Sequence, residues 1–102
     1  MSTAQTVNQK ICPHPNTLTN ATLIAIKQDK PILLDYYLYS KQKKCKLVKT
    51  QENDTILYKT NDEYTSPLQK LFKIDNSNVD GDKGDMLAIS QNSVYILSAN
   101  IL

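Results

Sequence analysis

The densest apolar segment of the chain lies at residues 31–49, PILLDYYLYSKQKKCKLVK. Successive side chains of a strand point to opposite faces of a sheet, so an extended segment here would have one apolar face and one mixed face. The apolar face would carry Ile32, Leu34, Tyr36 and Leu38, and the mixed face would carry Leu33, Asp35, Tyr37 and Tyr39. A helix is the competing interpretation, but the tyrosines and the leading proline favour a strand. We therefore predict a β-hairpin with a polar turn at 40–43.

Shorter segments with the same alternation predict the other strands of a β domain. The expected strands are 18–27, 55–60, 86–90 and 94–98. Their short spacing and the turn residues between them are typical of antiparallel connections. The pattern predicts a mainly β fold, a single small antiparallel β domain of about six to seven strands, arranged as a barrel or a curved sheet.

Residues 67–73 depart from this alternation and predict one short helix. Ser66 and Pro67 are typical of a helix start, with serine as the N-cap and proline at the first helical position. Leu68, Leu71 and Phe72 then follow at helical spacing. We expect this helix to cover an open end or face of the sheet.

The two ends of the chain differ in character. Residues 1–16 are polar and contain Pro13 and Pro15, which disfavour regular structure. We predict a flexible N-terminal arm at 1–16 and a single β-rich domain at 17–102. The chain ends with ANIL, which is apolar except for Asn100, and we expect these residues either to pair in the sheet or to lie in a subunit contact.

The net charge of +2 is too small to indicate a polyanionic partner, so only the distribution of charge along the chain is informative. Residues 27–50 hold seven lysines against two acids, whereas residues 52–85 hold eight acids against four lysines. The chain contains twelve lysines and no arginine, so it lacks the side chain best suited to bidentate contacts with phosphate or guanine. The pattern predicts a basic hairpin followed by an acidic half.

The tyrosines of the mixed face and the lysines around the predicted turn form the candidate interaction surface. It comprises Tyr37, Tyr39, Lys41, Lys43, Lys44 and Lys46. Aromatic residues are enriched at interface cores, and the acidic half of a second copy would complement the lysines. Alternatively, the tyrosines would stack on bases and the lysines would neutralise phosphates. A third interpretation is a solvated turn whose lysines prevent edge-to-edge aggregation.

Other residue clusters fall short of a chemical site. Loop 75–85 resembles a calcium loop with Gly81 at the invariant glycine position, but Leu87 occupies the place of the closing glutamate. Cys12 and His14 supply two metal ligands where a structural zinc site needs four. His14 is the only histidine, and no nucleophile lies beside it in a recognised motif. We therefore predict no catalytic residue, no cofactor and no metal, and a protein that is not an enzyme.

Three segments carry a resemblance to a known family. The segments PILLDYYLYS, DEYTSPLQKLFKI and MLAISQNSVYILSANI resemble a family of small proteins of large nucleocytoplasmic DNA viruses, the marseillevirus-like ones in particular. The resemblance covers about residues 20–102 and implies a viral protein of the particle or of the cytoplasmic viral factory. It implies no activity and no catalytic residues.

These observations together predict a non-enzymatic binding or structural protein. We expect it to self-associate as a homo-oligomer, to have a host or viral protein as a further partner, and to reside in the cytoplasm or the virion. A nucleic-acid-binding module that uses the lysine and tyrosine hairpin is the alternative. We expect no membrane association, because no segment approaches the length of a transmembrane helix.

Overall fold

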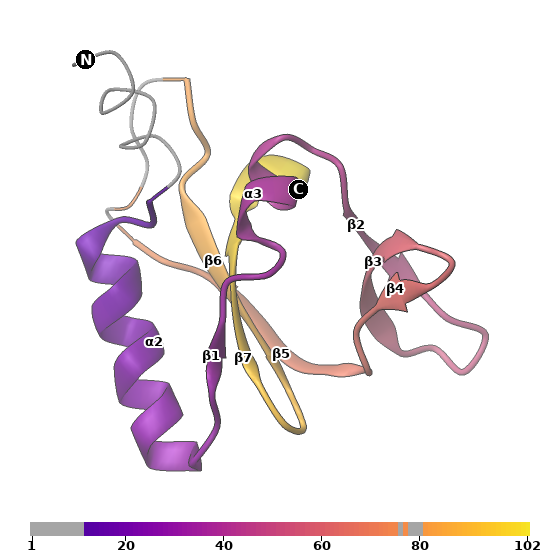
Figure 1. Ribbon diagram of the computed structural model, residues 1–102, viewed down its shortest axis with the longest axis horizontal. Coiled ribbons are helices and arrows are strands. Elements are labelled where there is room, and N and C mark those ends of the chain that lie inside the picture. The colour runs from indigo at the N-terminus through magenta and orange to yellow at the C-terminus, as the bar shows by residue number, and fades with distance from the viewer. Residues whose placement is uncertain (1–11, 76, 78–80) are drawn as a thin grey trace.

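The computed structural model describes residues 12–75, 77 and 81–102, which form two β-sheets and one long helix (Figure 1). The helices are α2 (Pro15–Gln28), α3 (Tyr37–Lys41) and the 3-10 helix η1 (Ala99–Ile101). The large sheet has the strand order β1-β7-β6-β5, and the small sheet has the order β2-β3-β4. Strands of the large sheet are β1 (Ile32–Leu33), β5 (Leu68–Lys73), β6 (Asp85–Ser90) and β7 (Val94–Ser98). Strands of the small sheet are β2 (Lys46–Lys49), β3 (Thr55–Thr60) and β4 (Glu63–Tyr64).

The elements pack in three layers, with the large sheet between α2 and the small sheet (Figure 1). The first core lies between α2 and the large sheet. Its buried residues are Ala21, Tyr37, Ile74, Leu87, Val94 and Ile96. The second core lies between the two sheets, with buried residues Tyr36, Cys45, Leu57, Met86, Ala88, Leu97 and Ala99. Because β6 contributes to both cores, every one of its residues is buried.

Part of the predicted fold is confirmed. The described residues contain seven strands, and β3 and β7 have the expected bounds, while β6 begins one residue early. The barrel and the purely antiparallel sheet are wrong. In the described part of the chain the strands form two separate open sheets, and β1 runs parallel to β7.

The predicted first strand at 18–27 is a helix, α2, and it includes the last residues of the predicted arm. Pro15 occupies the first helical turn, and the His14 side chain accepts a hydrogen bond from the Asn16 N–H at 2.9 Å, which caps the helix. Thr17 and Ala21 lie one turn apart and are fully buried. These small side chains let the helix backbone approach the sheet closely. Residues 1–11 of the predicted arm lie outside the described residues.

The predicted first hairpin strand is also interrupted by a helix. Only Ile32 and Leu33 form a strand, β1, and the chain then turns into the five-residue helix α3. Tyr36 packs in the second core and Tyr37 in the first, so the two neighbouring rings pack on opposite faces of the large sheet. The Ser40 hydroxyl accepts a hydrogen bond from the Ser98 N–H at 2.8 Å, which ties α3 to the end of β7.

The predicted helix at 67–73 is strand β5, and a bulge explains the false helical spacing. Leu68 pairs with Ser90, but Lys70 pairs with Ile89, so one extra residue is inserted in β5. Leu71 pairs with Ala88, which lies on the same face as Ser90. The bulge therefore places Leu68 and Leu71 on one face of a strand although they are three residues apart.

The C-terminal residues fold back on the domain instead of pairing in a sheet. Ala99 is buried, and its N–H donates to the Gly84 carbonyl at 2.8 Å. The 3-10 helix η1 packs against α3, as Figure 1 shows beside the label of the C-terminus. The expected sheet pairing is wrong for these residues. Within the described residues, no helix is long and apolar enough to span a bilayer.

Candidate functional site

Tyr37, the first residue of the predicted interaction surface, lies inside the protein. Its side chain belongs to the first core and is 3% exposed. Its hydroxyl donates to Asp85 Oδ1 at 2.9 Å. Burial, followed by the nearby Asp85 carboxylate, raises the pKa of Tyr37 well above its ordinary value of 10.0. The hydroxyl therefore remains a donor at any physiological pH, and the ring cannot reach a partner.

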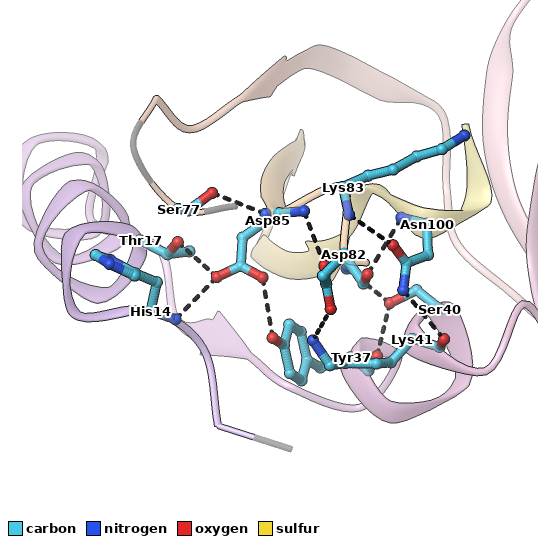
Figure 2. Close-up of polar contacts among 12 residues, drawn as sticks. His14, Thr17, Tyr37, Ser40, Lys41, Ser77, Asp82, Lys83, Asp85 and Asn100 are labelled. Atoms are coloured by element: carbon cyan, nitrogen blue, oxygen red, sulfur yellow. Dashed lines mark hydrogen bonds and ion pairs between the residues drawn. The ribbon is translucent and has the colours of Figure 1, made fainter. Parts of the chain in front are cut away.

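Asp85 joins three segments of the chain through the hydrogen bonds shown in Figure 2. Its Oδ2 accepts from the His14 N–H at 2.9 Å and from the Thr17 hydroxyl at 2.7 Å, and its own N–H donates to Ser77 Oγ at 2.9 Å. The residue is 3% exposed. Since both carboxylate oxygens already accept hydrogen bonds from the protein, Asp85 holds α2 and α3 onto β6 and is not placed to act on a substrate.

Lys41 is engaged inside the molecule as well. Its Nζ lies 2.6 Å from Asp82 Oδ2 and 5.7 Å from the centre of the Tyr37 ring. Partial burial alone would raise the pKa of Asp82, but hydrogen bonds from Lys41 and from the Gly84 N–H outweigh it, so the pKa lies below its ordinary value of 3.8. This ion pair joins the basic and acidic parts of one copy.

Tyr39 is half-buried and packs on the second core. The Nζ of Lys59 lies 3.6 Å from the centre of its ring, an arrangement typical of a cation–π contact. The same Nζ lies 3.1 Å from Glu63 Oε1. One face of the Tyr39 ring is therefore already covered by a paired lysine.

The other three lysines of the predicted surface remain exposed and line an open cavity. Lys43, Lys44 and Lys46 are exposed where the chain passes from α3 into β2. Together with Cys45, Tyr58 and Lys59 they line a cavity of about 310 Å³. We call this cavity the lysine cleft.

Two tyrosines that the hairpin prediction did not include lie beside the lysine cleft. In the small sheet, Lys46 pairs with Tyr58, and Tyr58 pairs with Tyr64. Leu57 points into the second core, so alternation places Tyr58 on the outer face of the sheet. The two tyrosine rings are nearly parallel, with an interplanar angle of 19° and centroids 6.5 Å apart. Lys46, Tyr58 and Tyr64 therefore form one row across the outer face.

The outer face of α2 is a second exposed surface, and it carries three large apolar side chains with the exposed Thr19 and Thr22 between them. Leu18, Leu23 and Ile26 are 42%, 63% and 74% exposed. Leu18 and Ile26 lie two turns apart, and Leu23 neighbours Ile26 at i, i+3 spacing, so they share one side of the helix. The only charged residue of the helix is Lys27. Sequence alternation missed this face because it assigned the segment to a strand.

In the described part of the chain, no group of three His, Cys, Asp or Glu side chains is placed to hold a metal ion. Residues 76 and 78–80 of the calcium-like loop lie outside that part. Cys12 is exposed, whereas Cys45 is buried. Burial raises the pKa of the Cys45 thiol to about 11, so this thiol is protonated at neutral pH and is a poor nucleophile.

Comparisons with known proteins found no relative that would indicate the function of these surfaces. No protein-family model, no curated protein and no solved structure matches the chain. The resemblance to small proteins of large nucleocytoplasmic DNA viruses therefore stays a prediction from the sequence.

Proposed function

We propose that this chain is a non-enzymatic binding protein that self-associates through the outer face of α2. The observation that supports the proposal is the exposure of Leu18, Leu23 and Ile26 on one helix face with a single charged residue beside them. Large exposed apolar side chains grouped on one side of a protein are typical of an interaction site, and here Thr19 and Thr22 lie between them. A role in assembly also agrees with the viral particle or viral factory that the sequence resemblance implies.

Charge favours a second copy as the occupant of this face, with the two helices antiparallel. Asn16 Nδ2 donates to the Asp75 carbonyl at 2.6 Å, which places the exposed Asp75 at the N-terminal end of α2. Lys27 lies at the C-terminal end of the same helix. Asn16 and Lys27 fall on the Leu23 flank of the helix, so a two-fold axis would bring Lys27 of each copy toward Asp75 of the other.

This arrangement differs from the charge-driven assembly expected from the sequence. Lys41 and Asp82 pair within one copy, and Asp85 is buried. These groups are therefore unavailable to a second copy. Apolar contacts on α2, with the Lys27 and Asp75 pairs at the rim, carry the proposed association instead.

Sedimentation velocity between micromolar and higher protein concentrations tests the proposal. We expect wild-type protein to form a species of twice the chain mass of 11.5 kDa. The double variant Leu23→Gln with Ile26→Gln should be a monomer, because it removes apolar contacts from both copies while glutamine keeps a high helix propensity. Loss of even one buried aliphatic contact per copy should weaken the dimer by more than about tenfold.

Leu34→Gln is the matched control. Leu34 is 50% exposed in the segment between β1 and α3, away from the proposed contact, so this variant should dimerise like the wild type. A wild-type protein that is monomeric at every concentration would refute the proposal. So would a dimer that the α2 double variant leaves intact.

A further inference from the structure

We propose that the lysine cleft and the adjoining Tyr58 and Tyr64 bind single-stranded nucleic acid. This site lies on the small sheet, at the other side of the molecule from α2 (Figure 1). It does not depend on self-association. Its residues overlap the predicted interaction surface only in Lys43, Lys44 and Lys46.

The charge of the cleft is uncompensated at these three positions. Lys41 and Lys59 form ion pairs with Asp82 and Glu63. No described residue forms an ion pair with Lys43, Lys44 or Lys46, and all three are exposed within four consecutive positions. Such a cluster attracts a phosphate backbone, because bound lysines release counterions from the polyanion.

The aromatic pair gives the cleft a surface for bases. Tyr64 is 58% exposed and lies nearly parallel to Tyr58. Tyr58 in turn lines the lysine cleft, and its hydroxyl donates to the side-chain oxygen of Asn61, which orients the ring. The row from Lys46 through Tyr58 to Tyr64 therefore presents a positive charge followed by two aromatic rings. The lysine would contact a phosphate, and the rings would stack on the neighbouring bases.

A single strand fits this arrangement better than the other anionic polymers. In a duplex the faces of the bases are stacked on one another, so exposed tyrosine rings have no bases to receive. An acidic peptide would use the lysines but would gain little from an exposed ring pair. The chain has no arginine, which removes the usual bidentate contact with guanine. We therefore expect binding that tolerates many sequences and depends on stacking and charge.

Fluorescence anisotropy with a labelled oligothymidine of about 12 nucleotides, within the usual range of site sizes, tests the site at low salt. Tyr64→Ala should weaken binding by about tenfold, because stacking of one base contributes ~1–3 kcal/mol. Lys43→Ala with Lys44→Ala should also weaken binding, and it should reduce the slope of log affinity against log salt by about 0.7 for each lysine removed.

Lys70→Ala with Lys73→Ala is the charge-matched control. Both residues are exposed on β5, outside the lysine cleft, so this variant should retain wild-type affinity. Circular dichroism of each variant verifies that it is folded. A competition arm uses oligoglutamate of equal charge, which should displace the oligonucleotide poorly.

Three results would overturn the proposal. The first is the absence of an anisotropy change at low salt. The second is equal loss of affinity in the cleft variant and in the β5 control, since that would indicate a diffuse charge effect. The third is unchanged affinity in Tyr64→Ala together with efficient displacement by oligoglutamate, which would assign the cleft to an acidic polypeptide instead.

Discussion

Asp85 is the residue on which the arrangement of the helices depends. It lies at the start of β6 and accepts hydrogen bonds from Thr17 of α2, from Tyr37 of α3 and from the backbone of His14. A buried carboxylate is tolerated when its oxygens are hydrogen-bonded. The sequence pattern placed Asp85 in a loop. In the structure it is the first residue of β6 and lies on the same face of the strand as Leu87, two residues later.

Tyr37→Phe tests the importance of this cluster. The variant keeps the ring in the first core but leaves Asp85 Oδ1 without its donor, which should lower the free energy of unfolding by about 1–3 kcal/mol. Urea denaturation measures the change. Tyr64→Phe removes a hydroxyl from an exposed ring and should change stability by less than about 0.5 kcal/mol. Equal effects of the two variants would contradict a structural role for the buried hydroxyl.

The ion pair between Lys41 and Asp82 predicts a specific dependence of stability on pH. The pKa of Asp82 in the folded protein lies below 3.8, so the unfolded chain takes up the proton first. The stabilisation is therefore complete above pH 3.8 and is lost as the pH falls through the lower pKa of the folded state. At neutral pH we expect wild type to be about 1 kcal/mol more stable than Asp82→Asn.

Urea titrations of both proteins from pH 7 down to pH 2 measure this difference. It should shrink toward zero at the acid end. Asp54→Asn, in the exposed turn between β2 and β3, serves as the matched control and should show a smaller difference throughout. A constant difference between wild type and Asp82→Asn across the titration would show that the ion pair is not its source.

Among the elements, β6 should be the most sensitive to loss of side-chain volume. Leu87 is fully buried in the first core, and Leu87→Ala should lower the free energy of unfolding by about 2–5 kcal/mol, from lost burial and the cavity left behind. Leu71 on the neighbouring edge strand β5 is 37% exposed, so Leu71→Ala should cost clearly less. Thermal and urea unfolding of both variants measure the difference. Comparable losses would show that β6 is not the centre of the fold.

Sequence alternation between turn residues predicted β3, β6 and β7 well, although burial itself does not alternate in β6, where every residue is buried. Where it failed, another contact decided the conformation. In α2 the spacing of Thr17 and Ala21, together with Pro15 at the first turn, indicates a helix, but the alternation of Thr22, Ile24 and Ile26 with Leu23 and Ala25 predicted a strand. In β5 the bulge gives a strand the residue spacing of a helix.

The candidate site was predictable only in its charges. Lys43, Lys44 and Lys46 lie on the surface, as the basic composition of their segment indicates. Tyr37 and Tyr39 pack inward because α3 replaces the expected strand and redirects both rings. The stacking of Tyr58 on Tyr64 depends on the pairing of β3 with β4, and the segment that contains β4 carries the sequence pattern of a loop. Packing against distant parts of the chain sets the positions of Tyr37 and Tyr39. The register between β3 and β4 sets the positions of Tyr58 and Tyr64.

At the scale of the whole molecule, the two proposed surfaces lie far apart. The protein measures 48 × 31 × 22 Å, and Figure 1 shows α2 near one end of the longest axis and the small sheet near the other. A dimer formed through α2 would therefore carry its two lysine clefts at its opposite ends. Such a dimer would hold one long strand at two places, whereas a short strand would occupy only one cleft.

This geometry predicts that self-association strengthens binding only to long strands. A strand of about 60 nucleotides should bind wild type at least tenfold more tightly than it binds the monomeric Leu23→Gln, Ile26→Gln variant, because the second contact becomes intramolecular. An oligonucleotide of about 12 nucleotides should bind both proteins equally, since it fits a single site. Anisotropy at matched concentrations of clefts measures both affinities. Equal affinity of dimer and monomer for the long strand would contradict the placement of the clefts at opposite ends of the dimer. A monomeric wild type would instead show that the α2 contact is wrong. A short strand that does not bind would show that the cleft is not a binding site.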